Sequence, residues 1–513
     1  MSNKDIDTNN TIVVDGWSNI GGYYGRKNIV INVGVEEFEN NPMKVLEDNL
    51  SNILSMHKRN VLEMEYLMEY QKGKQDILEK TRANNSETIN NKHITNYAWE
   101  FVNFKKGYYV GKPIKYVDLQ VDTQDSEIKY LNRYLKDVKK ASKDLIKYEN
   151  MLITGIAHTM TIPKRVDIDN EYESPFEYTV LDNKYVFVVK SNDIYKSRLF
   201  ALYISHIKED NNNEYDLYTI YYKNKCLQVR KSALKGLELV RETTMPISEC
   251  ITEYQLNEQR MGVFEPVLVS LNSLNGITSH QLDQLEENVN SYLTFENVDI
   301  DEITENIQDF RDKRILVVNT NNPEAPAKIG KIVIDTEQTP INQKYDKIEQ
   351  RTYDIVGVPM PTSSTGQGVS GEAQQYGGGW ENAQNIALVD TLYIKQFEEE
   401  DLGKFIRICK EQVDSKIKKL YPTEIEIKYT INKSNNMQVK AQSMTYYIDK
   451  GFTREQALRI CEITDDPQTE GKIADDNYAI QKQKEIEYEL EKAKKTQELN
   501  SKQEDNSNKN VKE

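Results

Sequence analysis

The stretch 343–400 most strongly constrains the fold. Apolar residues at helical spacing predict a first helix that ends at Val358-Pro359-Met360-Pro361, because proline lacks an N–H group and disfavours helical geometry in the residue before it. A small, uncharged segment follows, Thr362, Ser363, Ser364, Thr365, Gly366, Gln367 and Gly368. Ser370 can cap a second helix, with Glu372 in its first turn, that continues past Trp380 to about Leu402. The pattern therefore predicts a neutral loop held between two helices.

The glycines of this loop do not form a phosphate-binding motif. No strand is expected before the loop, and neither Gly-Lys-Ser/Thr nor G-x-G-x-x-G follows it. On the residues alone, a surface loop between two core helices is the simpler interpretation. Gly377-Gly378-Gly379 is unusual within an expected helix and indicates a kink or a close approach to another chain.

Composition excludes several classes of protein. The net charge of −16 argues against a protein that coats nucleic acid. Four widely spaced cysteines predict reduced thiols, with neither a disulfide framework nor a zinc site, and no cofactor is expected. No segment is apolar enough to span a membrane, and no signal peptide is expected. An acidic cluster at 299–305 leaves a metal-dependent nuclease as an alternative, although no second set of ligands accompanies it.

The remaining patterns predict an α+β chain. Before the loop we expect a helix from Pro42, a strand over 101–116 that is interrupted by glycines, and a helix over 126–150. Successive strands should fill 151–241, which together with the preceding helices makes a helix-plus-sheet domain. Ile425, Ile427, Tyr429 and Ile431 alternate with polar residues and predict a strand that returns to this domain.

A long helix and a small insert precede the loop region. Leucines and other apolar residues at three- and four-residue intervals predict one helix from 263 to about 295, with the repeat Leu268, Leu271, Leu274, Leu282, Leu285, Val289 and Tyr292. The insert 296–340 should contain strands at 314–318 and 329–334. These are too few for a core of their own, so we expect them to pair between neighbouring copies of the chain.

Taken in order, these segments resemble the portal proteins of tailed bacteriophages, specifically the Gp6-like family of siphophages. The matching motifs are Gly-x-Gln-x-Ile within 70–77, Gly-Tyr-Tyr-x-Gly-x-Pro-Ile-x-Tyr within 91–116, the helix 263–293, Val356-Gly357-Val358-Pro359 with Ser370-Gly371-Glu372-Ala373, and Gly451-Phe452-Thr453 with Asp465-Asp466-Pro467. The resemblance covers most of residues 42–475. Gly377–Gly379 departs from the family pattern, where ordinary helix formers are expected.

The resemblance implies a portal fold with an α/β wing, long stem helices, a small α/β clip, a tunnel loop and a helical crown. Its parts would be an N-terminal arm and wing at 1–262, stem helices at 263–295 and 341–356, the clip at 296–340, the tunnel loop at 357–370, a long helix returning to the wing at 371–440, the crown at 441–495 and an unfolded tail at 496–513. The family does not carry out catalysis, and ATP hydrolysis would belong to a separate terminase motor.

The resemblance also implies the partners. Such chains form a homo-oligomeric ring, commonly of twelve subunits, at one capsid vertex after assembly in the host cytoplasm. The ring passes double-stranded DNA non-specifically during packaging and ejection, and meets the terminase large subunit, head–tail adaptors, and the major capsid and scaffolding proteins. Residues 362–368 would face DNA, and we expect subunit contacts at Leu282, Leu285, Val289, Tyr292, Ser370 and Trp380. A head–tail adaptor is an alternative, although adaptors are shorter and lack this order of helices.

Overall fold

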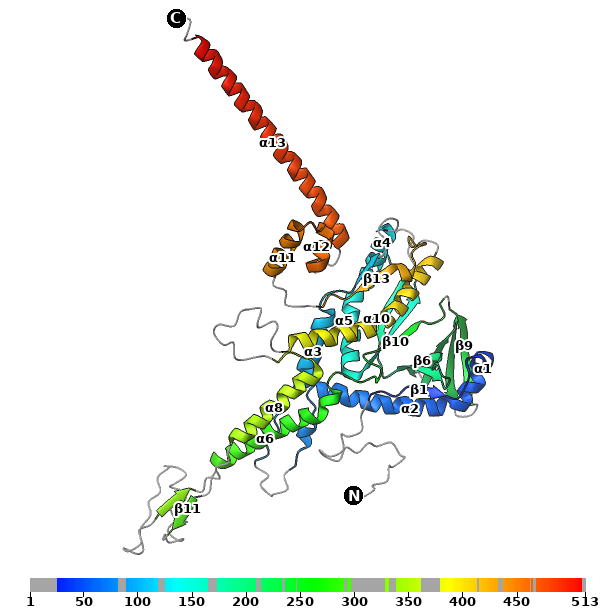
Figure 1. Cartoon of the computed structure of the whole chain (residues 1–513). Helices are drawn as coiled ribbons and strands as arrows, with labels where there is room; N and C mark the ends of the chain where they lie inside the picture. Colours follow the sequence, from blue (N-terminus) through cyan, green and yellow to red (C-terminus); the bar gives the residue numbers. More distant parts are fainter. Residues whose placement is uncertain are drawn as a thin grey trace.

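The computed structural model describes residues 25–81, 89–118, 125–164, 173–208, 214–232, 236–245, 247–289, 293–296, 328–331, 338–360, 379–412, 415–431, 437–461, 463–464 and 467–509. Helices and strands are both abundant, which confirms the α+β class. Figure 1 shows a body of sheets and helices from which the paired helices α6 and α8 project on one side and the helix α13 on another.

A six-stranded sheet forms one end of the body. Its strand order is β1-β5-β6-β7-β8-β9, in which only the β1–β5 pair is parallel. The strands are Ile29–Ile31, Val186–Ser191, Arg198–Lys208, Glu214–Tyr222, Lys225–Ser232 and Gly236–Thr244. Helices α1 (Val35–Asn40) and α2 (Pro42–Gln71) bury apolar side chains against it, with Phe38 stacked on Phe200 at a ring-centroid distance of 4.7 Å. The expected run of strands is therefore present, and the helix expected from Pro42 covers them.

Two smaller sheets complete the body. The order β10-β3-β4 joins Ile251–Gln255, Ile156–Pro163 and Phe176–Leu181. Strand β13 (Ile425–Lys428) pairs antiparallel with β2 (Lys115–Asp118). The strand predicted at 425–431 thus returns to the N-terminal part of the chain, in a two-stranded sheet of its own. Helices α4 (Asp125–Asp137) and α5 (Lys140–Thr154) occupy the segment where one helix was expected.

The strand predicted over 101–116 is wrong. Residues Tyr97–Val110 form helix α3, and only Lys115–Asp118 is extended. The Asn96 side chain caps the helix by accepting a hydrogen bond from the Trp99 N–H at 3.2 Å. Aromatic residues and glycine disfavour a helix locally, but α3 buries apolar side chains around much of its circumference, and this packing outweighs propensity.

The projecting pair consists of α6 (Leu268–Val289), which follows a short 3-10 turn at Glu265–Val267, and α8 (Gln338–Val356). The helix expected to reach residue 295 ends earlier, because Leu293–Glu296 forms strand β11. This strand pairs antiparallel with β12 (Lys328–Lys331) of the same chain. The strand expected at 329–334 therefore has one partner within its own subunit, and pairing between copies of the chain stays a prediction. Residues 314–318 lie outside the described residues.

A ladder of polar contacts fixes α6 to the extended segment before α3. The Thr95 N–H donates to Asn275 Oδ1 at 2.9 Å, and the His93 N–H donates to Ser279 Oγ at 2.9 Å. One turn further along α6, the buried Asp283 carboxylate lies 2.7 Å from Lys80 Nζ. These α6 residues recur every four positions and so share one face of the helix. The leucine repeat that predicted α6 did not reveal this polar face.

Helix α10 (Trp380–Glu411) crosses the body, and its second half lies on a buried cluster of charges. Glu398 accepts hydrogen bonds from Lys140 Nζ, at 3.1 Å, and from Lys147 Nζ. Asp144 bridges the same two lysines, and all four side chains are buried. Burial opposes ionisation of Glu398, but attraction to the two lysines outweighs it and lowers the pKa to about 2.

The chain continues as α11 (Met437–Asp449), α12 (Arg454–Cys461) and α13 (Pro467–Lys509), which extends away from the body (Figure 1). The tail expected to be unfolded after residue 496 is thus helical as far as Lys509. Glutamate, lysine and glutamine favour a helix, and pairs such as Glu491–Lys495, at 2.8 Å, support it.

We expect Glu398→Gln to lower the free energy of unfolding by about 3 kcal/mol near neutral pH, because it leaves two buried lysines with one carboxylate between them. The folded-state pKa lies below the ordinary value of 4.5, so the ion pairs stabilise the fold fully above that value and lose this effect as the pH falls towards about 2. Denaturant titrations at several pH values measure both effects. An unchanged acid dependence in the variant would contradict this role.

Candidate functional site

The candidate site is the base from which the segment 361–378 leaves α8 and returns to α10. Residues 362–368 and Ser370 lie outside the described residues, but both flanks are placed. A Cβ atom on Gly379, immediately before α10, would lie 3.7 Å from the Cα atom of Pro359, just beyond α8. The residues that precede and follow the segment therefore lie next to each other.

Helix α8 ends in a tight turn that packs on α10. The N–H groups of Gly357 and Val358 both donate to the Tyr353 carbonyl, at 2.9 and 3.1 Å. Gly357 has a φ of +70°, and a Cβ atom there would lie 2.3 Å from Ile386 Cδ1 of α10. Glycine is therefore required both for the left-handed backbone and for the close approach of the two helices.

Helix α3 supports the α10 side of the base. The Trp380 ring lies 5.8 Å from that of Phe104 and 6.4 Å from that of Tyr108, measured between centroids. Further along α10, the Asp390 carboxylate accepts a hydrogen bond from the Tyr109 hydroxyl at 2.6 Å and lies 3.5 Å from Lys105 Nζ. Burial lowers the pKa of Lys105, and the attraction of Asp390 opposes this shift.

The same helix supports the α8 side. The Tyr97 hydroxyl lies 2.9 Å from that of Tyr345 and donates to Glu349 Oε1 at 2.5 Å. The Tyr353 hydroxyl donates to Glu100 at 2.9 Å. Burial, followed by these carboxylate contacts, raises the pKa of both Tyr97 and Tyr353. Both phenols therefore stay protonated and remain hydrogen-bond donors at neutral pH.

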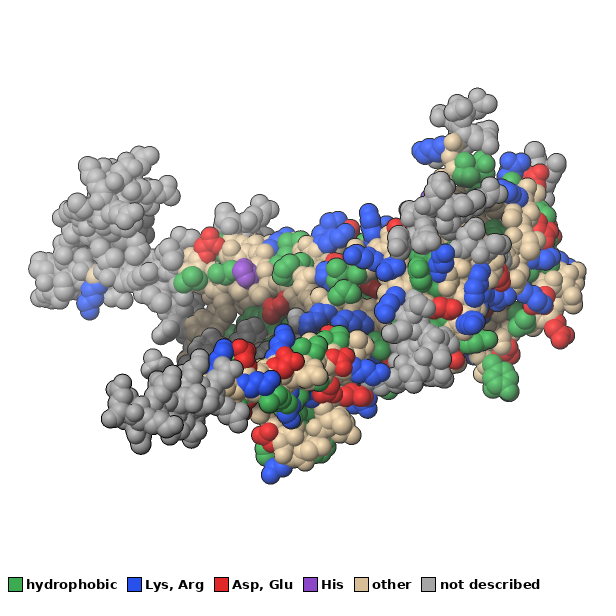
Figure 2. Space-filling model, turned by 90° about the horizontal axis from the view of Figure 1, so that it is seen from above, with side chains coloured by type: hydrophobic (Ala, Val, Ile, Leu, Met, Phe, Trp, Pro, Cys, Tyr) green, Lys and Arg blue, Asp and Glu red, His purple; other side chains and the backbone are tan. Residues whose placement is uncertain are grey.

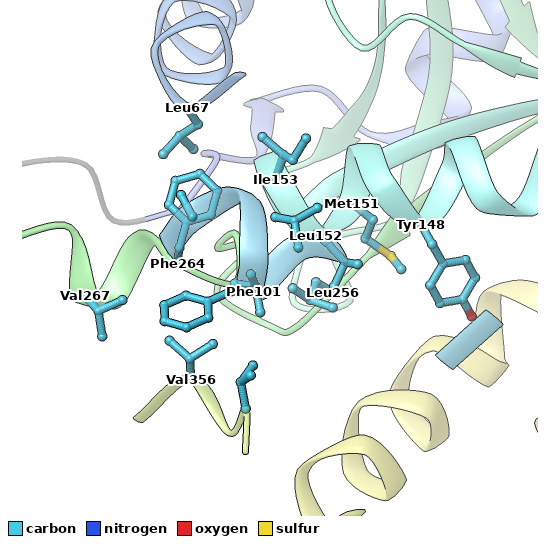
Figure 3. Packing of buried hydrophobic residues seen from close by; sticks show 14 of the residues in the cluster. Leu67, Phe101, Tyr148, Met151, Leu152, Ile153, Leu256, Phe264, Val267 and Val356 are labelled. Atoms are coloured by element: carbon cyan, nitrogen blue, oxygen red, sulfur yellow. The ribbon is translucent and has the colours of Figure 1, made fainter. Parts of the chain in front are cut away.

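Buried apolar side chains also pack against the base. Figure 3 shows Phe101 of α3 beside Phe264, which precedes α6, and near Val356 of α8. The Phe101 ring also meets the Tyr353 ring edge-on at a centroid distance of 5.0 Å. Helix α8 and the start of α10 are thus anchored on α3, and the flanks of the loop have a fixed position.

The residues predicted at a subunit interface have different environments. Leu285 is exposed on α6 and Leu282 is half-buried, whereas Trp380 packs within its own chain. Val289 is the last residue of α6, and Tyr292 and Ser370 lie outside the described residues.

Sequence reasoning missed the supporting role of α3. The signal was present in Tyr97, Phe101, Phe104 and Tyr108, whose three- and four-residue spacing is typical of a helix face.

The described flanks of the site are joined by hydrogen bonds between tyrosines and carboxylates. At the base, Glu100, Glu349 and Asp390 each accept a hydrogen bond from a tyrosine. Within the described part of the chain, no three His, Cys, Asp or Glu side chains are arranged to hold a metal ion, and the acidic cluster at 299–305 lies outside it. No described helix is long and apolar enough to cross a membrane.

Gly357→Ala should destabilise this base by about 2 kcal/mol, since alanine is strained at positive φ and its methyl group meets Ile386. Gly403→Ala is the matched control, because that glycine lies within α10 with no atom near the added Cβ. It should stabilise the chain by about 0.5 to 1 kcal/mol. Thermal and denaturant unfolding of the two variants measure the contrast. Equal effects of both substitutions would show that the turn after α8 imposes no special backbone demand.

Comparison with known protein families gives a match that covers these elements. The model of the family described as phage portal protein, SPP1 Gp6-like, matches residues 50–499 of the 513-residue chain. A search among curated proteins gives no match. The matched residues include α3, both projecting helices, the loop and α10. The chain therefore belongs to the SPP1 Gp6-like family of phage portal proteins.

Proposed function

We propose that this chain forms the portal ring through which double-stranded DNA enters and leaves the capsid, with residues 362–368 lining the narrowest part of the channel. Membership of the family implies a structural role in a homo-oligomeric ring at a capsid vertex. The arrangement of the loop base carries the finer proposal. The segment 361–378, which contains the uncharged residues 362–368, has its two flanks side by side, and α3 supports both of them.

The chemistry of the loop suits a channel for moving DNA. Strong contacts between lysine or arginine and phosphate would slow a sliding duplex, whereas serine, threonine, glycine and glutamine make only weak contacts. The charge of the chain is −16, and Figure 2 shows acidic, basic and hydrophobic side chains interspersed on the visible face. Weak, sequence-independent contact is consistent with transport in both directions.

The other regions take the roles that the family suggests. The body of sheets is the wing, α6 and α8 are the stem, and α11 to α13 form the crown. The far end of the stem carries the clip, which would bind the terminase large subunit during packaging and head–tail adaptors afterwards. A ring of twelve subunits set in the major capsid protein, with scaffolding protein present during assembly, completes the proposal.

Deleting Thr362–Gln367 should leave ring assembly intact and impair DNA packaging or retention, because these residues have no large apolar side chain to contribute to a core. Negative-stain imaging tests for rings with a central hole, and packaging of DNA into procapsids tests function. A same-length replacement of Thr362–Gln367 by glycine and serine is the matched control and should still package. Loss of rings in the deletion variant would show that the loop is structural.

A further inference from the structure

Helix α10 has an apolar face that no other part of the described chain covers. Leu388, Val389 and Leu392 are 49%, 68% and 73% exposed, and their spacing places them on one side of the helix. The opposite side, with Ala383, Ala387 and Ile394, is buried in the core. Leu388 and Val389, with Leu392 one turn further along, form a continuous aliphatic ridge, which is unusual on a surface that faces only water.

Helix α3 exposes a second apolar group, Trp99, which is 56% exposed. It lies two residues from both Tyr97 and Phe101, so it points about 200° away from the side chains that contact α8. Helix α3 contacts α10 through Phe104, Tyr108 and Tyr109. Trp99 and the α10 ridge take part in none of these contacts, so one chain carries two separate exposed apolar surfaces.

A closed ring requires two such faces. Each subunit in a ring contacts its two neighbours through different surfaces, and these must complement each other. Tryptophan is the residue type most often found at the energetic centre of an interface, and an aliphatic ridge can enclose its ring. Exposed Glu381 and Glu399 flank the ridge on α10 and supply the polar rim that such contacts have.

We propose that in the ring Trp99 of one subunit packs against Leu388, Val389 and Leu392 of its neighbour. The partner is a second copy of this chain, and the inference rests on the proposed ring function. Because Trp99 and the ridge belong to the two helices at the loop base, this contact sets the spacing between neighbouring loops around the channel. It differs from the contacts at Leu282 and Leu285, which lie further along the stem.

Two variants test each face separately. Val389→Glu combined with Leu392→Glu places charge on the ridge, and Trp99→Glu places charge on the other apolar surface. Both should fold, since the replaced side chains are exposed and glutamate favours helices, above all in the first turn of α3. Circular dichroism and thermal unfolding check this. In sedimentation velocity, each variant alone should remain a single chain under conditions where the wild-type chain forms rings.

Mixing the two variants gives the decisive result. Each retains the face that the other has lost, so the mixture should form one intact contact and yield heterodimers without rings. Trp99→Ser is a second, uncharged variant, and should raise the concentration at which half the chains assemble by about tenfold or more. Tyr195→Ser is the matched control: Tyr195 is 88% exposed at the β5–β6 turn, belongs to neither face, and its replacement should leave rings unchanged.

The outcomes distinguish a failure of the proposed contact from a failure of the ring proposal. Normal rings from either charged variant, or a mixture without heterodimers, would overturn the contact and leave the ring proposal standing. Loss of rings in Tyr195→Ser to the same extent would also overturn it, because the effect would not be specific to these faces. If the wild-type chain formed no ring at all, the proposed function would fail, and the pairing with it.

Discussion

The packing of α3 against both α8 and α10 is the contact on which the arrangement of this protein depends. One side of α3 binds the last turns of α8 through tyrosine–carboxylate hydrogen bonds and edge-on aromatic contacts. Adjacent positions hold the start of α10 through Trp380 and Asp390. Helices α6 and α8 pack against each other, so these contacts, together with the polar contacts of α6 to residues 80–95, fix the projecting pair relative to the body.

The two halves of α10 are held by different combinations of contacts. The first half packs mainly on aromatic and aliphatic side chains, whereas the second half combines apolar packing of Leu402 and Phe405 with the buried charges of its own Glu398 and Asp401. Asp401 accepts hydrogen bonds from Thr159, at 2.9 Å, and from Tyr254, at 2.7 Å. Such directional contacts fix the register of the helix on the sheets in a way that apolar packing alone does not.

The sequence predicted those parts in which one local pattern dominates. The proline stop after Val358, the alternation at 425–431 and the apolar repeat of α6 correctly predicted the end of α8, strand β13 and one of the two projecting helices. Helix α3 was misassigned because its aromatic residues favour strands and its glycine disfavours a helix, whereas its helical form depends on packing against α5 and on contacts with residues some 250 positions away. The β11–β12 pair joins residues about 35 apart, a partnership that periodicity cannot specify.

The central claim is that the loop between α8 and α10 faces DNA. The four native cysteines are buried, so Ser364→Cys supplies one thiol for a tethered DNA crosslinker. In particles arrested during packaging, we expect this position to crosslink to the entering DNA. Tyr195→Cys at the exposed turn between β5 and β6, carrying the same reagent, should not. Equal crosslinking at the two positions, or none at residue 364, would contradict the account.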